Sequence, residues 1–292
     1  MYRKISKIQR NEDVDLNTAV RRIADFFQIE GTWVDGDKNE LLDWQIFATY
    51  DRIQNIEVSD NKITLKEYNK EILSRFNYDI RILPWEKDNI SREVMRKAMI
   101  GYYPGEDQIT IPHFDINNRF IGLRGRTICL EDAEKYGKYR PIKVCGILYN
   151  HPLGMNLYGI NYAKNNIRLF EKAIVFESEK SVLQYMTYFG FENSIAVACC
   201  GSNLSQFQVE ELKSCGAKEI IIAYDRQYKE VNDDEYLKWL KKLKGFKTKF
   251  SNDMTISFIL DQDHILGYKD SPIETSKENF LRLLKERIIL WK

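Results

Sequence analysis

Two short apolar segments of the sequence each run into an acidic side chain suited to metal chemistry. The segments are Lys172–Ser181 (KAIVFESEKS) and Glu219–Gln227 (EIIIAYDRQ), and their apolar runs stop at Glu177 and Asp225. Continuous apolar runs of this kind are typical of parallel strands that are buried on both faces. Because ligands gather beyond the carboxyl ends of such strands, both carboxylates are expected at one edge of a sheet. Their oxygens would hold a hard divalent cation there.

The elements around these two acids alternate regularly. Apolar runs predict strands over 173–176, 194–198, 220–224 and 255–260. Amphipathic patterns predict helices over 160–168, 179–189, 205–214, 233–243 and 276–288. Strands that alternate with helices are typical of an α/β domain, so this part of the chain is predicted to have a parallel-cored sheet. An acidic, turn-rich loop is expected over 261–274.

Ahead of this domain the sequence predicts shorter elements of both kinds. Helical patterns cover 16–29, 63–75 and 92–100, and β-type segments cover 108–113 and 119–123. Polar turn residues (DINN) separate the two β-type segments, as expected of a hairpin. The sequence therefore predicts a helical N-terminal region followed by a small α+β subdomain.

Four basic residues follow the predicted hairpin. Arg124 and Arg126 come directly after its second segment, and Lys138 and Arg140 lie in a polar stretch that we expect to be flexible. A guanidinium group binds two phosphate oxygens at once, whereas an ammonium group acts as a point charge. These residues are candidate contacts to nucleic acid or nucleotide, and the alternative is a solvated basic surface.

Composition limits the classes of protein that fit. The chain is 43% hydrophobic and 30% charged, with a formal net charge of +1, so binding of nucleic acid would depend on a local basic patch. No apolar stretch approaches the length of a membrane span, and the charged start MYRKISKIQR is unlike a signal peptide. The five cysteines and three histidines form no zinc-ligand spacing. We expect no zinc, no membrane partner and a cytoplasmic location in a bacterial host.

Several motifs in order resemble those of bacterial-type DNA primases, and most closely their phage-encoded versions. Ile100–Arg126 resembles the strand pair that leads into a Gly-Gly-Arg turn, Lys138–Pro141 (KYRP) the basic motif after it, and Leu157–Ile167 (LYGINYAKNNI) the Leu-Tyr-Gly helix. The acidic segments resemble a Toprim domain, the metal-binding core of these enzymes. In that domain an acidic residue follows the first strand, a glycine the second and Asp-x-Asp the third.

The resemblance implies a division of the chain into four parts. They are a mostly helical N-terminal region (1–75), a basic α+β primase-like subdomain (76–165), a Toprim domain (166–262), and an acidic loop with a C-terminal helix (263–292). The family's zinc ribbon has no counterpart in this sequence and is expected to be absent or encoded elsewhere.

The resemblance also assigns roles to the residues. Glu177 and Asp225 would be catalytic metal-site carboxylates, Gly201 would be the structural loop glycine, and Gln227 with Asp263 or Asp270 would complete the metal site. The basic residues would contact template or triphosphate. Phosphoryl transfer needs positioning and charge neutralisation, so the implied cofactor is Mg²⁺ or Mn²⁺. The implied partners are single-stranded DNA, ribonucleoside triphosphates, a replicative helicase and a separate zinc-ribbon protein.

Two departures from the family pattern keep other functions open. Gln227 replaces the second Asp of Asp-x-Asp, and Ser181 stands where an Asp is common. Hard-cation affinity depends on ligand charge, so we expect weaker metal binding, with Glu179 and Glu230 as substitute ligands. The alternatives are a degenerate primase that binds DNA or replisome proteins without chemistry, and a Toprim nuclease.

Overall fold

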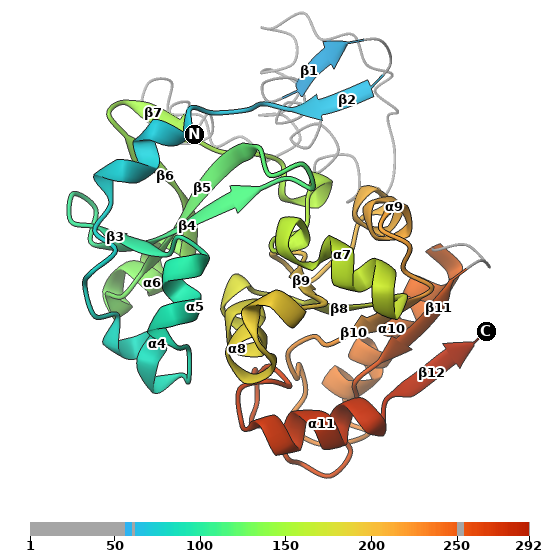
Figure 1. The fold of residues 1–292 in the computed structure, drawn as a ribbon. Helices are drawn as coiled ribbons and strands as arrows, with labels where there is room; N and C mark the ends of the chain where they lie inside the picture. Colours follow the sequence, from blue (N-terminus) through green and yellow to red (C-terminus); the bar gives the residue numbers. More distant parts are fainter. Residues whose placement is uncertain (1–55, 60–61, 250–253, 292) are drawn as a thin grey trace, which may run out of the picture. The chain divides into compact units, whose positions relative to one another are not determined.

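The computed structural model describes residues 56–59, 62–249 and 254–291 (Figure 1). The predicted helix over 16–29 lies outside these residues. Contacts group Glu57–Lys292 into one compact unit. The described strands form two five-stranded sheets and one two-stranded sheet of β1 (Ile56–Ser59) and β2 (Lys62–Leu65). The fold is therefore mixed α/β, while the predicted four-part division stays a prediction.

The first five-stranded sheet is antiparallel throughout. Its strands follow chain order: β3 (Gly101–Tyr103), β4 (Gln108–Phe114), β5 (Phe120–Thr127), β6 (Tyr139–Val144) and β7 (Ile147–Tyr149). Asp115 forms the predicted turn between β4 and β5, since its carboxylate accepts hydrogen bonds from the backbone N–H of Asn117 (3.0 Å) and Arg119 (2.8 Å). The predicted hairpin is confirmed.

Short helices accompany this sheet. They are η1 (Lys70–Arg75), α4 (Leu83–Lys87), α5 (Arg92–Lys97) and α6 (Leu130–Tyr136). Ser91 begins α5 as an N-cap, because its hydroxyl accepts a hydrogen bond from the Val94 N–H at 3.2 Å. The basic side chains at the end of α5, Arg96 and Lys97, suit the negative end of the helix dipole.

The second five-stranded sheet has the order β12-β11-β10-β8-β9. Its strands are β8 (Lys172–Phe176), β9 (Ala196–Ala198), β10 (Glu219–Ile222), β11 (Thr255–Phe258) and β12 (Ile288–Trp291). Four of them pair in parallel, and β12 joins β11 antiparallel at one edge. The predicted parallel-cored sheet is thus present, with an antiparallel edge strand that the sequence analysis missed.

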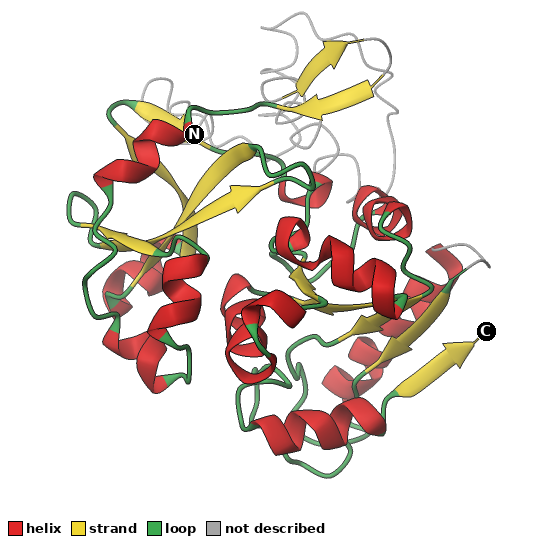
Figure 2. Cartoon of the chain, in the orientation of Figure 1, coloured by secondary structure: helices red, strands yellow, loops and turns green. Residues whose placement is uncertain are grey.

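Helices precede and connect the strands of this sheet, as Figure 2 shows in red and yellow. They are η2 (Leu153–Met155), α7 (Ile160–Phe170), α8 (Glu179–Phe189), η3 (Phe191–Asn193), α9 (Gln206–Ser214), α10 (Asp234–Lys249) and α11 (Lys277–Lys285). Ser205 caps α9 through a complete capping box with Gln208, which explains why the predicted boundary was accurate.

Side chains alternate between the two faces of the parallel sheet. Val175 of β8 belongs to a core cluster with residues of α7, α9 and α10, whereas its neighbours Ile174 and Phe176 belong to a cluster with residues of α8 and α11. This second cluster also contains Ile109 and Ile111 of β4. The two sheets therefore share one apolar core, which fixes the antiparallel sheet against α8.

Three predictions about these elements are wrong. The helix predicted over 63–75 is β2 followed by η1, since the β-branched pair Ile63 and Thr64 favours a strand and Asn69 starts a new turn by accepting a hydrogen bond from the Glu71 N–H. The stretch expected to be flexible forms α6 and β6 instead. The closing helix ends at Lys285 and is followed by β12.

Within the part of the chain that the structure describes, no helix combines the length and the apolarity that crossing a membrane requires.

Candidate functional site

Glu177 and Asp225 lie at the same edge of the parallel sheet. Glu177 directly follows β8, and Asp225 follows β10 after two further residues. These strands are parallel neighbours, with Val175 opposite Ile222, so the chain leaves both at their carboxyl ends. We refer to Glu177 and Asp225 as the edge pair.

The edge pair has the electrostatics of two largely buried carboxylates that repel one another. Burial, together with repulsion from the nearby Asp225 carboxylate, raises the pKa of Glu177 to about 8. Burial also raises the pKa of Asp225 to about 7, with added repulsion from Glu274 and Asp270. Glu177 Oε1 and Asp225 Oδ1 are buried and have no hydrogen-bond partner among the described residues. A hard cation would neutralise both groups and satisfy these oxygens, so the residues fit Mg²⁺ or Mn²⁺.

Of the two later acids, the structure brings Asp270 and not Asp263 toward the edge pair. The Arg226 N–H donates to the Asp270 carbonyl at 2.9 Å, and the Lys269 N–H donates to the Arg226 carbonyl at 2.8 Å. These two bonds fasten the loop that carries Asp270 to the chain next to Asp225. Asp263 is half-exposed and forms an ion pair with Arg282 of α11 instead.

Arg226 anchors this loop, and the sequence analysis missed it. Its buried guanidinium donates to Asp261 (3.4 Å), to the Leu266 carbonyl and to Nδ1 of His264 (2.8 Å). Gln227 follows it and is half-buried. The available signal was an arginine directly after Asp225, but the partners of Arg226 lie much later in the chain and no local pattern marks them.

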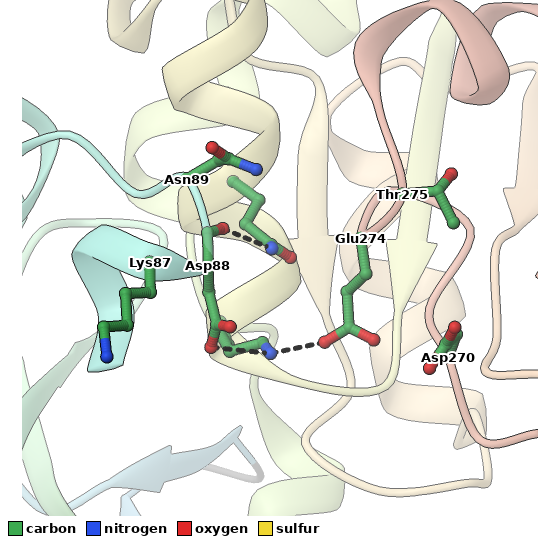
Figure 3. A pocket seen from close by; sticks show the side chains of 8 residues that line it. Lys87, Asp88, Asn89, Asp270, Glu274 and Thr275 are labelled. Carbon is green, nitrogen blue, oxygen red and sulfur yellow. Dashed lines mark hydrogen bonds and ion pairs between the residues drawn. The ribbon is translucent and has the colours of Figure 1, made fainter. Parts of the chain in front are cut away.

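Lys180 and Glu274 are two further charged residues near Asp225 that the sequence analysis did not single out. They line a pocket of about 500 Å³ together with Lys87, Asp88, Asn89, Gln184, Asp270 and Thr275. Lys180 Nζ lies 3.1 Å from Asp88 Oδ2 and also contacts Glu274 Oε1. In Figure 3, the carboxylates of Asp88 and Glu274 face one another, and dashed lines mark these ion pairs. The pocket thus adjoins the edge pair, and the ammonium group of Lys180 supplies a positive charge in its wall.

Arg124 is held by the protein itself. It lies within β5 rather than after the hairpin, and its Nη1 is 2.6 Å from Oε1 of Glu179 on α8. Its side chain is only 12% exposed and stacks over the Tyr139 ring at 5.2 Å. A phosphate would have to displace Glu179 to reach this guanidinium, so the structure does not present Arg124 as a free phosphate contact.

The other three basic residues are more open. Arg126 donates to the Tyr139 hydroxyl at 2.8 Å and lies over its ring. Lys138 is exposed, and Arg140 is half-buried, 3.9 Å from the exposed carboxylate of Asp132. Arg126 faces Tyr139 and Gly125 faces Arg140 across β5 and β6. Neighbouring residues of a strand point to opposite faces, so Arg126 lies on the face of Tyr139 and Arg140 on the other face, over the Tyr136 ring. Lys138 directly precedes β6, and the structure therefore does not gather all three residues on one face.

Glu179 is the centre of a buried ionic cluster. Its carboxylate also lies 3.1 Å from His113 Nε2. Burial would raise the pKa of Glu179, but Arg124 and His113 outweigh it and lower the pKa to about 2. Ligand atoms of His113, Glu179 and Cys200 lie within 4.8 Å of one another, which is the spacing of a metal cluster. The Arg124 guanidinium already takes the place of a cation beside Glu179, so we interpret the cluster as an ion-pair network.

Two other sequence predictions receive little support from the geometry. Glu230 is exposed and lies 3.9 Å from His264, and it is not among the acids that act on Glu177 or Asp225. Gly201 lies in an exposed loop after β9, and a Cβ atom there would meet nothing within 4 Å. The space around it does not require a glycine.

Comparisons with known proteins give one curated relative and several solved structures. No family model matches the sequence. The SPbeta prophage-derived uncharacterized protein YorJ of Bacillus subtilis (strain 168) is 32% identical over 299 aligned residues, which cover 97% of this chain and 76% of that protein.

The similar solved structures are primases. The DnaG catalytic core matches with a TM-score of 0.55 and 16% identity, covering 76% of this chain and 79% of its own. A DnaG primase catalytic domain bound to single-stranded DNA matches with a TM-score of 0.54 and 16% identity, covering 76% and 80%. At these identities the likeness establishes a primase-like fold.

Proposed function

This chain belongs to the family of the prophage-derived protein YorJ, and from that premise and its primase-like fold we propose that it is a DNA primase module. The proposed reaction is metal-dependent synthesis of short RNA primers on single-stranded DNA, at a Toprim site built on the edge pair. The observation that carries the proposal is the meeting of Glu177 and Asp225 at the carboxyl edge of neighbouring parallel strands, with one unpartnered oxygen each.

The residues of the proposed metal site would have separate roles in the reaction. Mg²⁺ or Mn²⁺, when bound, would neutralise charge on the triphosphate during phosphoryl transfer. Glu177, Asp225 and Asp270 would hold the cation, with Gln227 as a neutral oxygen ligand beside them. The alternative role for Glu177 is that of a general base, which would accept the proton of the attacking 3′-hydroxyl.

The strand pair β5–β6 supports the nucleic-acid part of the proposal. Arg126, Lys138 and Arg140 would contact phosphates of the template or of the nucleotide. The guanidinium groups of Arg124 and Arg126 lie 5.2 and 5.0 Å from the centre of the Tyr139 ring, and these contacts help to order the two side chains. The further partners implied by the resemblance, a helicase and a separate zinc-ribbon protein, belong to the same proposal.

A primer-synthesis assay tests this function. The protein is incubated with single-stranded DNA and labelled ribonucleotides in Mg²⁺ or Mn²⁺, beside Asp225→Ala and Glu177→Gln. Short RNA products that need metal and disappear in both variants are expected. Asp263→Ala is the matched control, since Asp263 pairs with Arg282 and should leave synthesis unchanged. Primer synthesis that is retained in Asp225→Ala would contradict the assignment of the metal site to the edge pair.

A DNA-binding module without chemistry is the second candidate. It is favoured by Gln227, which lowers the charge of the metal site, and by Lys180, which places an ammonium group beside it. This candidate predicts salt-dependent binding of single-stranded DNA that survives Asp225→Ala, with no nucleotide incorporation. A Toprim nuclease would instead degrade labelled DNA or RNA in the same metal ions.

A further inference from the structure

The acidic groups around the edge pair share a lysine on α8. Lys180 is only 13% exposed, and its ammonium group is held between Asp88 and Glu274. The positive charge of Lys180 also lowers the pKa of Asp225, whereas the charges of Glu274 and Asp270 raise it. A buried ammonium group needs carboxylate partners, and here it draws two of them from separate segments of the chain.

Glu274 has both of its oxygens engaged. Oε1 contacts Lys180, and Oε2 accepts a hydrogen bond from the Ser271 N–H at 3.0 Å. The same segment places the Ser271 hydroxyl 3.0 Å from that of Ser181. Glu274 is therefore not free to turn toward a cation, whereas Glu177 and Asp225 each keep one buried oxygen that has no hydrogen-bond partner in the described part of the chain.

We propose that Lys180 is the resident cation of this acidic cluster and limits the proposed metal site to one divalent ion. The inference rests on the proposed function, because it concerns the same site. A second divalent ion would need carboxylates beyond the edge pair and Asp270, and Glu274, the further carboxylate whose charge acts on Asp225, is neutralised by Lys180. Residue 181 is a serine and residue 227 a glutamine, so neither adds charge.

Lys87 offers a matched control in the same pocket. It is exposed, and in Figure 3 its side chain points away from Asp270 and Glu274. Replacing Lys87 or Lys180 with glutamine removes the same charge from the same pocket wall. Only the second replacement should release a carboxylate to the metal site.

Titration of the full chain with Mn²⁺, followed by calorimetry and by electron paramagnetic resonance, tests the inference without measuring activity. The wild type is expected to bind one Mn²⁺, and Asp225→Ala should abolish that binding. Lys180→Gln should bind a second Mn²⁺ or bind the first about tenfold more tightly, because it removes a positive charge that acts on Asp225 and repels a divalent ion. Lys87→Gln should stay within about twofold of wild type.

A double variant guards against loss of folding in the single one. Lys180→Gln/Glu274→Gln removes the ion pair without changing net charge and is expected to bind one Mn²⁺ with wild-type affinity. Loss of binding in the double variant would identify Glu274 as a ligand and overturn the inference. So would a Lys180→Gln protein that folds and binds Mn²⁺ as the wild type does. If no Mn²⁺ binding sensitive to Asp225→Ala occurs in any variant, the proposed metal site itself fails.

Discussion

Replacing Glu179 with glutamine removes the charge that neutralises Arg124 inside the protein. The carboxylate is 1% exposed, the guanidinium is 12% exposed, and their closest atoms are 2.6 Å apart. Lowering the Glu179 pKa from 4.5 to about 2 corresponds to about 3 kcal/mol in favour of the ionised form. Removing one partner of a buried pair typically costs about 3–5 kcal/mol. We therefore expect Glu179→Gln to lower the free energy of unfolding by about 3 kcal/mol.

Urea unfolding at pH 7, followed by the fluorescence of the buried Trp85 and Trp239, measures this loss. In thermal unfolding, the same loss should lower the melting temperature by about 6–12 °C, at about 2–4 °C per kcal/mol. Glu171→Gln is the control, because its ion pair with Lys218 is exposed and should contribute less than about 1 kcal/mol. The double replacement Arg124→Met/Glu179→Met removes both charges and should cost less than Glu179→Gln alone.

The pH dependence gives a second check. The pKa of Glu179 is lower in the folded protein than in the unfolded chain, so its stabilisation is complete above about pH 4.5 and is lost as pH falls toward 2. The difference between wild type and Glu179→Gln should therefore shrink below pH 4. A difference under about 1 kcal/mol at pH 7, or one that grows as the pH falls, would refute the reasoning.

Three further predictions follow from buried groups. Burial raises the Glu211 pKa to about 8, so the contribution of Glu211 to stability falls as the pH rises from about 4.5 to 8. Glu211→Gln still accepts the hydrogen bond from the Leu157 N–H and should raise the melting temperature more at pH 8 than at pH 5. An equal change at both pH values would contradict this prediction. A Cβ on Gly122 would lie 2.5 Å from His151 Nδ1, so urea unfolding should show a loss of about 1–3 kcal/mol for Gly122→Ala and under about 0.5 for Gly201→Ala. Mn²⁺ binding at the edge pair should tighten from pH 6 to 8, because protons must leave carboxyl groups whose pKa values are about 8 and about 7; titrations with equal affinity at both pH values would count against the site.

Much of the parallel sheet was predictable from local patterns. The apolar runs before Glu177 and Asp225 indicated buried strands, and capping residues such as Ser205 marked where helices begin. Parallel strands bring their carboxyl ends to one edge, so the meeting of the edge pair followed from strand type alone. The strand at the C-terminal edge was missed because Ile288–Trp291 is short and continues the apolar pattern of the preceding helix.

The sequence by itself determined the alternating α/β order, the hairpin and the acids at the strand ends, because each depends on neighbours in the chain. Only the tertiary structure decided which acid joins the edge pair and which basic residues stay open. Arg226 selects Asp270 through a distant loop, and Glu179 takes Arg124 from 55 residues away. The first choice depends on backbone hydrogen bonds between distant segments, and the second on two charges that burial forces together after folding. No local spacing in the sequence records either contact.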